Sequence, residues 1–239
     1  MNINKTVLIT GASKNLGDYL KKYYLEKKFN VIGISKSLES SPTSNFYKCD
    51  LSNARKTRSL FLKLKKKFKN IDLIISCAGT SKKTYKIKEN MHDWKRAFKN
   101  NFYSFSNLLD SYLYVYKYMP TKIIVISTIA SIKITKAPIT YSVAKSALNY
   151  YVQFKAKELA KNDVKINIIL PGNILMKKNN WAQKIKKNNV KIKKYIKENV
   201  PLNRFCSPEQ VSGICDYLFS KAGDNITGSK FIIDGGESL

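Results

Sequence analysis

The sequence has 239 residues, of which 44% are hydrophobic, and a formal net charge of +28 from 44 basic and 16 acidic side chains. This length and composition are typical of a globular α/β domain and exclude a disordered chain. No apolar run approaches the roughly 18 residues that a membrane helix needs. The N-terminus also lacks the apolar core and cleavage site of a signal peptide, so we expect a cytoplasmic protein.

Apolar runs alternate with helical patterns along the chain, which predicts a parallel sheet covered by helices on both faces. The expected elements are strand 6–10, helix 15–28, strand 30–35, strand 46–50, helix 52–69, strand 71–79, helix 101–118, strand 122–128, helix 139–162, strand 164–172, helix 207–220 and strand 230–236. We find no repeat and no long linker, so we expect one α/β domain over residues 1–239, built as a doubly wound parallel sheet. Ligands bind such sheets at the carboxyl ends of the strands.

The positive charge is compatible with nucleic acid, a membrane surface or an anionic substrate as partner. The lysines are scattered, and the sequence has no helix-turn-helix, zinc-finger or RNP-type pattern. We interpret most of the charge as solvated surface lysine, and nucleic-acid binding as the weakest option. Residues 177–198 are denser in lysine, with Trp181 and Tyr195 between the charges. They suit a lid over an anionic substrate, a docking surface or an amphipathic helix.

The cysteine and histidine content gives no metal site. The four cysteines form no CxxC pair and no Cys/His cluster, and His92 is the single histidine. Metal-ligating side chains normally recur at short, regular spacings. We therefore expect four free thiols and no bound metal.

The segment TGASKNLG, from Thr10 to Gly17, follows the first expected strand and opens the first expected helix. A glycine-rich turn at this place lets the backbone approach a dinucleotide pyrophosphate. The helix N-terminus adds N–H donors and a partial positive charge. The alternative is an ordinary turn between a strand and a helix.

This turn and the motifs after it resemble the short-chain dehydrogenase/reductase family from Thr6 to Gly236. The further matching motifs are CDL at 49–51, SCAG at 76–79, Asn101 seven residues after Trp94, VISTIAS at 125–131, YSVAK at 141–145, PGNI at 171–174, SPEQV at 207–211, ITG at 226–228 and DGG at 234–236. The resemblance implies a Rossmann-like fold and an NAD(P)-dependent oxidoreductase. The chain departs from the family pattern at Asn15, Ser76 and Met176. Asparagine tolerates the left-handed backbone that a glycine turn requires.

Tyr141 and Lys145 lie four residues apart and share one face of a helix. A phenol titrates near pH ~10. We expect the neighbouring ammonium to lower the pKa of Tyr141, which then acts as general acid/base near neutral pH. The resemblance implies that Lys145 also binds the hydroxyls of the nicotinamide ribose.

The family carries a serine thirteen residues before this tyrosine, and position 128 is a threonine that follows Ser127. Neighbours on a strand point to opposite faces, so only one of the two hydroxyls can face the site. We select Thr128 as the donor to the substrate carbonyl oxygen. The alternative is a structural Thr128 and an impaired site. The resemblance implies that Asn101 completes a tetrad by holding a water that relays protons to Lys145; a helix kink or cap is its alternative role.

The same resemblance implies a cofactor site. Its expected residues are Gly11, Ser13, Lys14, Asn15, Leu16, Gly17, Ser35, Lys36, Asp50, Leu51, Ala78, Gly79, Tyr141, Lys145, Pro171, Gly172 and Ile174. An NAD site usually carries an acid after the second strand, whereas the 2′-phosphate of NADP requires a cation. The second strand ends in ISKS, without an acid before Glu39, and lysines stand at 14 and 36. We therefore expect NADP(H) rather than NAD(H).

The resemblance implies NADPH-dependent reduction of a carbonyl to an alcohol, and it is strongest to members that resemble 3-oxoacyl-[acyl-carrier-protein] reductases. The basic substrate loop, at about 173–200, favours an anionic or carrier-linked substrate. A phosphorylated or nucleotide-linked sugar or polyol is the second option. A non-catalytic NADP-binding scaffold is the option of another class, because of the departures from the motifs. The family forms dimers and tetramers through the helices expected at 101–118 and 139–162, so we expect a homo-oligomer, with a homotetramer favoured.

Overall fold

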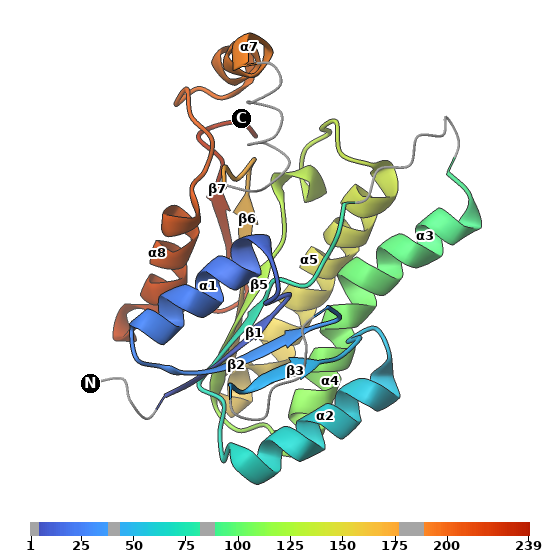
Figure 1. The fold of residues 1–239 in the computed structure, drawn as a ribbon, viewed down its shortest axis with the longest axis vertical. Helices are drawn as coiled ribbons and strands as arrows, with labels where there is room; N and C mark the ends of the chain where they lie inside the picture. Colours follow the sequence, from blue (N-terminus) through green and yellow to red (C-terminus); the bar gives the residue numbers. More distant parts are fainter. Residues whose placement is uncertain (1–4, 38–43, 82–88, 177–188) are drawn as a thin grey trace.

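Seven parallel strands form the centre of the computed structural model, which describes residues 5–37, 44–81, 89–176 and 189–239 (Figure 1). The strands are β1 (Thr6–Thr10), β2 (Asn30–Ser35), β3 (Phe46–Lys48), β4 (Leu73–Ser76), β5 (Thr121–Ile126), β6 (Val164–Pro171) and β7 (Lys230–Ile233). They lie in the order β3-β2-β1-β4-β5-β6-β7, and each neighbouring pair is parallel. The order reverses direction beside β1, which places the switch point between β1 and β4. The expected doubly wound parallel sheet is confirmed.

Helices cover both faces of this sheet. The helices of the described residues are α1 (Asn15–Glu26), α2 (Ala54–Lys67), α3 (Met91–Phe98), α4 (Ser104–Tyr116), α5 (Ile139–Leu159), α7 (Asn189–Asn199) and α8 (Pro208–Phe219). Helices α1 and α8 pack on one face, and α2, α4 and α5 pack on the other (Figure 1). Helix α7 lies beyond the ends of β6 and β7, next to the C-terminus (Figure 1). Across the described ranges, no helix combines the length and apolar character needed to cross a bilayer.

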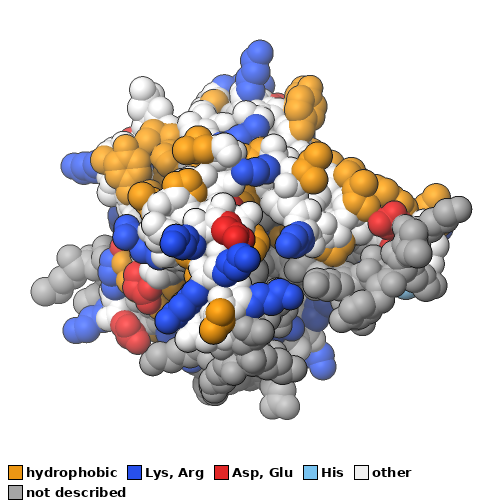
Figure 2. Space-filling view, turned by 90° about the horizontal axis from the view of Figure 1, so that it is seen from above, with side chains coloured by type: hydrophobic (Ala, Val, Ile, Leu, Met, Phe, Trp, Pro, Cys, Tyr) orange, Lys and Arg blue, Asp and Glu red, His pale blue; other side chains and the backbone are white. Residues whose placement is uncertain are grey.

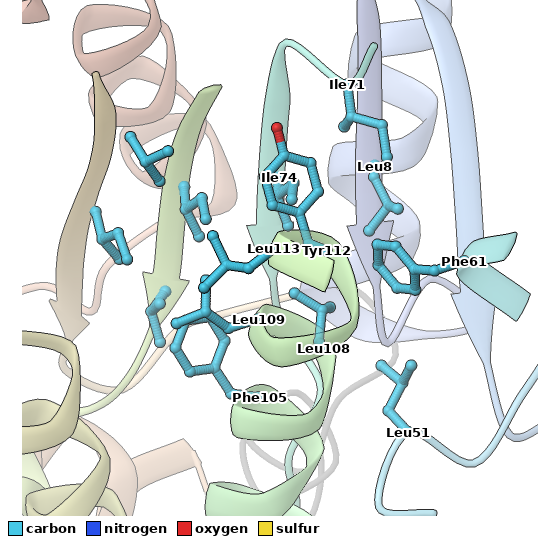
Figure 3. Packing of buried hydrophobic residues seen from close by; sticks show 14 of the residues in the cluster. Leu8, Leu51, Phe61, Ile71, Ile74, Phe105, Leu108, Leu109, Tyr112 and Leu113 are labelled. Carbon is cyan, nitrogen blue, oxygen red and sulfur yellow. The ribbon is translucent and has the colours of Figure 1, made fainter. Parts of the chain in front are cut away.

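The central strands β1, β4, β5 and β6 are buried on both faces, whereas the edge strands β3 and β7 are partly exposed. Successive residues of the central strands enter opposite layers of the core. Leu8 and Ile74 belong to the layer shared with α2 and α4, where they pack near Phe61, Leu108 and Tyr112 (Figure 3). The neighbouring strand residues enter the layer beneath α1 and α8. This double burial is why the strands appear in the sequence as continuous apolar runs rather than as alternating ones.

Side-chain caps decide where two of the helices begin. The Asn53 side chain accepts a hydrogen bond from the Lys56 N–H at 3.0 Å, so α2 begins at Ala54 and not at residue 52 as expected. Asn90 and Asp93 form a capping box that starts α3. Because each end of the box satisfies a main-chain N–H, a helix forms here that the sequence analysis did not predict.

A π-turn, η1 (Lys99–Tyr103), joins α3 to α4. The sequence analysis placed the start of one helix at 101 and its end at 118, and both bounds are wrong. The helical path already runs through 101 from α3, and α4 ends at Tyr116 because Lys117 and Tyr118 take left-handed backbone angles, with φ of 52° and 60°. A non-glycine residue in this region normally ends a helix.

One carboxylate ties α1 to α8 across the outer layer. Asp216 accepts hydrogen bonds from the Tyr23 and Tyr24 hydroxyls and forms an ion pair with Lys27. Tyr24 is fully buried, so its hydroxyl needs a partner inside the protein. The three bonds fix α1, and therefore its N-terminal turn, against the sheet.

Two glycines inside helices give opposite predictions for substitution by alanine. A Cβ at Gly17 in α1 would lie 2.3 Å from the Gly11 carbonyl oxygen, whereas a Cβ at Gly213 in α8 would have no neighbour within 4 Å. We expect Gly17→Ala to lower the free energy of unfolding by about 1–3 kcal/mol through overpacking. Gly213→Ala, the matched control, should raise it by about 0.5–1 kcal/mol through higher helix propensity.

Urea denaturation of both variants measures these changes. An unchanged or higher stability of Gly17→Ala would contradict the close approach of α1 to β1.

Candidate functional site

The candidate residues gather along the carboxyl edge of the sheet, where the parallel strands end. The turn after β1 holds Gly11, Ser13, Lys14, Asn15, Leu16 and Gly17; Ser35 ends β2 and Lys36 follows it; Asp50 and Leu51 follow β3; Ala78 and Gly79 follow β4; Thr128 follows β5; Tyr141 and Lys145 lie on α5; Asn101 lies in η1; and Pro171, Gly172 and Ile174 lie at the end of β6. Among the described residues, no three His, Cys, Asp or Glu side chains gather as a metal site.

The turn between β1 and α1 is shaped for close approach. Gly11 has φ of +67°, and a Cβ there would lie 3.0 Å from the Cys77 carbonyl oxygen. Asn15 has φ of 51°, which confirms that asparagine takes the left-handed conformation at this position. Lys14 makes no side-chain cap at the start of α1, so the N–H groups of the first turn point outward without that acceptor. This bare backbone cradle fits a pyrophosphate.

Three hydroxyl groups form a cluster beside that turn. Ser13 Oγ lies 2.8 Å from Ser35 Oγ and 2.9 Å from Ser37 Oγ. Lys14 and Lys36 follow two of these serines in the chain. Clustered hydroxyls flanked by cations suit a phosphate. The sequence analysis missed Ser37, although the two serines on either side of Lys36 were the signal.

The Lys36 side chain contacts two separate segments, the one that follows β3 and the π-helical segment η1. Its Nζ lies 3.0 Å from Asp50 Oδ1 and donates to Asn100 Oδ1 at 3.0 Å. Burial alone would raise the pKa of Asp50, but hydrogen bonds from Ser52 and from the Lys36 ammonium outweigh burial and lower the pKa. Lys36 therefore joins the candidate adenine residue to the segment that carries Asn101.

Tyr141 and Lys145 lie one turn apart on α5, as expected. Lys145 is buried, and its Nζ donates to the Ile126 carbonyl oxygen at 2.9 Å. Burial lowers the pKa of Lys145 to about 8. Burial also raises the pKa of Tyr141 to about 12, against the opposing effect of a hydrogen bond with Thr128. The expectation that the pKa of Tyr141 lies below its ordinary value is wrong, because the low dielectric around the phenol disfavours its anion.

Thr128, and not Ser127, is the hydroxyl that meets Tyr141. The Thr128 side chain hydrogen-bonds with Tyr141 and also accepts from the Ala130 N–H at 3.2 Å. Ser127 is buried, and its Oγ finds no hydrogen-bond partner within the described ranges. Its main-chain N–H donates to the Ile169 carbonyl oxygen at 2.8 Å, which continues the pairing of β5 with β6.

Asn101 is fully buried in the π-turn η1. Its amide donates to the main-chain carbonyls of Ala97 and Thr80 at 2.9 and 3.1 Å, and its Oδ1 accepts from the Thr80 N–H at 2.9 Å. A Cβ at Gly79 would lie 2.8 Å from Asn101 Oδ1 and 3.4 Å from Lys145 Nζ. The structure thus brings Asn101 and Lys145 together across the bare backbone of Gly79.

The end of β6 approaches the C-terminal segment. Gly172 N–H donates to the Ile233 carbonyl oxygen at 2.9 Å, and a Cβ at Gly172 would lie 2.9 Å from Asp234 Cβ. Ile174 forms an isolated parallel bridge with Cys206. These contacts place the segment that follows Pro171 at the carboxyl edge of the sheet, where β6 lies beside β5, the strand that precedes Thr128.

A hydrogen-bond chain that the sequence analysis missed supports Thr128. Asn149 Nδ2 donates to Ser131 Oγ at 2.7 Å, and Ser131 Oγ donates to the Thr128 carbonyl oxygen at 2.5 Å. Asn149 lies four residues after Lys145, on the helix face that also carries Tyr141. That spacing was the available signal. The face of α5 that carries the tyrosine therefore also fixes the turn that carries the threonine.

The comparisons with known proteins agree with this fold. A family profile described as "Enoyl-(Acyl carrier protein) reductase" matches residues 24–238. The 3-oxoacyl-[acyl-carrier-protein] reductase FabG of Buchnera aphidicola is 29% identical over 246 residues, covering 99% of this chain and 98% of that protein.

Two solved structures show the same architecture. A short chain dehydrogenase from Leptospira borgpetersenii with bound NAD+ has a TM-score of 0.86 at 25% identity, over 99% of this chain and 93% of that one. L-sorbose reductase from Gluconobacter frateurii, complexed with NADPH and L-sorbose, also has a TM-score of 0.86, at 19% identity over 99% and 98% of the two chains, and is similar in fold alone. Because the family match spans most of the sequence, the chain belongs to the short-chain dehydrogenase/reductase family, the NAD(P)-dependent oxidoreductases.

Proposed function

We propose that the protein is an NADPH-dependent reductase that converts a carbonyl to an alcohol on an anionic or carrier-linked substrate, as a 3-oxoacyl-thioester reductase does. The observation that carries this proposal is the hydrogen bond between the Thr128 and Tyr141 side chains, beside the buried ammonium of Lys145. Two hydroxyl donors that meet at one point can both bind a single carbonyl oxygen. The relative from Buchnera aphidicola, named as a 3-oxoacyl-[acyl-carrier-protein] reductase, supports a carrier-linked 3-oxoacyl group as substrate.

The residues at the carboxyl edge fit an NADP molecule. We assign the pyrophosphate to the turn from Gly11 to Gly17, with Leu16 in its helix; the 2′-phosphate to Ser13, Ser35, Ser37, Lys14 and Lys36; the adenine to Asp50 and Leu51; the nicotinamide ribose to Tyr141 and Lys145; and the remaining contacts to Ala78, Gly79, Pro171, Gly172 and Ile174. When it is bound, the nicotinamide supplies the hydride for the carbonyl carbon. The absence of an acid at the end of β2 favours NADP over NAD.

In this mechanism Tyr141 delivers the proton to the carbonyl oxygen. Because burial raises its pKa to about 12, the phenol keeps its proton at neutral pH and is poised as an acid. Thr128 donates a second hydrogen bond to the same oxygen. Lys145, with a pKa of about 8, is mostly cationic at neutral pH and stabilises the tyrosinate that forms. We assign to Asn101 the water that returns a proton through Lys145.

Surface charge supports an anionic substrate. Figure 2 looks onto the face of the molecule that lies uppermost in Figure 1, and Lys and Arg side chains are spread across it among apolar patches. On α7, Lys193, Lys194 and Lys197 are exposed. Positive potential at a site entrance raises the local concentration of anions. Residues 177–188 of the expected substrate loop, including Trp181, lie outside the described residues.

Three expectations stay predictions. Exposed apolar side chains on α5, among them Tyr150 at 75% and Phe154 at 62%, support a homo-oligomer. The cytoplasmic location and the treatment of residues 1–239 as one domain with its substrate loop at 173–200 rest on the sequence.

The first test is NADPH oxidation with a 3-oxoacyl thioester, keto-sugars and sugar phosphates as substrates. We expect activity on the thioester, and we expect Tyr141→Phe to lower kcat by about 10²–10⁴-fold because the proton donor is lost. Tyr217→Phe, which removes a hydroxyl from an exposed tyrosine on α8, should leave the rate unchanged.

Activity only on a sugar would replace the thioester proposal by the sugar or polyol oxidoreductase. Tight NADPH binding without any turnover would favour the non-catalytic scaffold.

The cofactor preference is tested with Lys36→Ala. Removing the cation takes away a partner of the 2′-phosphate and leaves the Asp50 carboxylate unpaired beside it. We expect the Kd for NADPH to rise by about 10–100-fold, as for a lost charge-assisted hydrogen bond. The Kd for NADH should change much less. Fluorescence titration measures both constants, with Lys66→Ala on the exposed face of α2 as control. Equal losses for both cofactors would contradict the assignment.

Asn149→Ala tests the support of Thr128. Without the amide, Ser131 loses its donor and the turn that carries Thr128 can shift. We expect kcat to fall by roughly tenfold or more, since small displacements of reacting groups are costly. The Kd for NADPH should stay the same. Gln153→Ala, at an exposed position on the same helix, is the control, and a kcat equal in both variants would refute the role.

A further inference from the structure

Glu237 is a buried carboxylate at the rim of the site. Only 6% of the surface of Glu237 is exposed to solvent. A carboxylate that is removed from water must be hydrogen-bonded or paired with a cation. The hydrogen-bond partners of Glu237 therefore indicate its structural role.

Those partners come from two separate elements. Tyr195 on α7 donates its hydroxyl to Glu237 Oε1 at 2.7 Å. Asn173, just after β6, donates its amide to Oε1 at 3.1 Å and lies 3.3 Å from Oε2. A bond from a hydroxyl to a carboxylate is charge-assisted and stronger than a neutral one. One side chain thus joins α7 to the segment that follows Pro171.

The backbone around Glu237 is packed tightly between the residues that follow α7 and the residues that follow β6. A Cβ at Gly235 would lie 2.8 Å from Val200, and a Cβ at Gly236 would lie 2.9 Å from Pro201. On the other side, a Cβ at Gly172 would lie 3.2 Å from Glu237 Oε2. The C-terminal segment and α7 lie side by side beyond the ends of β6 and β7 (Figure 1). The segment cannot shift without moving both neighbours.

The loop between η2 (Ile129–Ser131) and α5 joins the same contact. Lys133 Nζ donates to the main-chain carbonyls of Glu237 and Leu239. Lys136 Nζ lies 5.8 Å from the centroid of the Tyr195 ring, a cation–π distance. This loop connects Thr128 to Tyr141 along the chain. Three segments, namely α7, residues 171–174 and the loop before α5, therefore meet at Glu237 and Tyr195.

We propose that Glu237 is a positioning residue that fixes α7 against the segment 171–174 and so shapes the substrate end of the site. The Tyr195 hydroxyl is the matching donor from α7. Glu237 touches neither of the hydroxyls assigned to the chemistry, so it acts through the elements that it joins. The kinetic part of this inference rests on the proposed reduction, and the structural part does not.

Burial and charge both strengthen the bond. Burial raises the pKa of Tyr195 to about 12, and the hydrogen bond to Glu237 and its negative charge act in the same direction. The phenol therefore remains a donor over the working pH range. Removing the Tyr195 hydroxyl takes one of the side-chain donors away from the buried Glu237 carboxylate, which costs more than the bond itself contributes.

The structural test is hydrogen exchange of residues 189–199 followed by mass spectrometry. The variants are Tyr195→Phe, Glu237→Leu and their combination. We expect each single variant to speed exchange in α7 by about tenfold or more, the factor for one charged hydrogen bond. The double variant should exchange no faster than the faster single variant, because both break one interaction. Glu237→Gln keeps an acceptor oxygen and should restore much of the protection.

The controls are Glu198→Gln and Tyr118→Phe, which change exposed groups on α7 and before β5. Unchanged exchange in Tyr195→Phe, or effects that multiply in the double variant, would overturn the proposal. Tyr195→Phe preserves the ring, so it tests the bond even if Glu237→Leu does not fold.

Kinetics give the second readout. Tyr195→Phe should raise KM for the carbonyl substrate by about tenfold, with kcat changed much less and the Kd for NADPH unchanged. An unchanged KM in an active Tyr195→Phe variant would overturn the positioning role. Native protein that shows coupled exchange but reduces no carbonyl would refute the proposed reduction and still support the link between Glu237 and Tyr195.

Discussion

The buried ammonium of Lys145 constrains the geometry of the whole site. An amine taken out of water must find acceptors or lose its proton, and here the Ile126 carbonyl lies 2.9 Å away at the end of β5. That bond fixes the position of Lys145, and therefore of its turn of α5, relative to the end of β5. The bare backbone of Gly79 lies beside the same nitrogen, and a Cβ there would lie only 2.8 Å from Asn101 Oδ1. The tyrosine one turn earlier is then placed beside Thr128, whose turn is fixed by the bonds from Asn149 and Ser131.

Local sequence patterns predicted most of the fold and most of the residues of the candidate site. Continuous apolar runs predict the central strands because both faces are buried, and Asn15 shows the backbone angle that its chemistry permits. Other features depend on distant contacts or on burial, which no local pattern reports. Ser37 meets Ser13 across 24 positions, and Glu237 meets Tyr195 across 42. The direction of the pKa shift at Tyr141 was misjudged because desolvation raises the pKa of the phenol, and sequence spacing does not report desolvation.

Because acidic side chains are scarce, many lysine ammonium groups of this protein interact with partners other than carboxylates. With 44 basic and 16 acidic side chains, many ammonium groups cannot have a carboxylate partner. Lys122 donates to the carbonyls of Phe219 and Ser220 as well as pairing with Asp224. Other lysines lie over aromatic rings, as Lys21 does over Phe46 at 4.9 Å. Two of the carboxylates, Asp216 and Glu237, lie at joints between elements, and each accepts from side chains of two or more residues.

The π-turn at Lys99–Tyr103 has a consequence for how this region tolerates change in chain length. A π-turn holds one residue more than a regular helical turn, and each residue rotates a helix by about 100°. The extra residue therefore sets the angular offset between the face of α3 that packs on α5 and the face of α4 that packs on α2. Deleting one residue here would restore a regular helix but turn one of those faces to solvent. Length in this short segment is thus under tighter constraint than residue identity, which is the reverse of what holds for an ordinary surface loop.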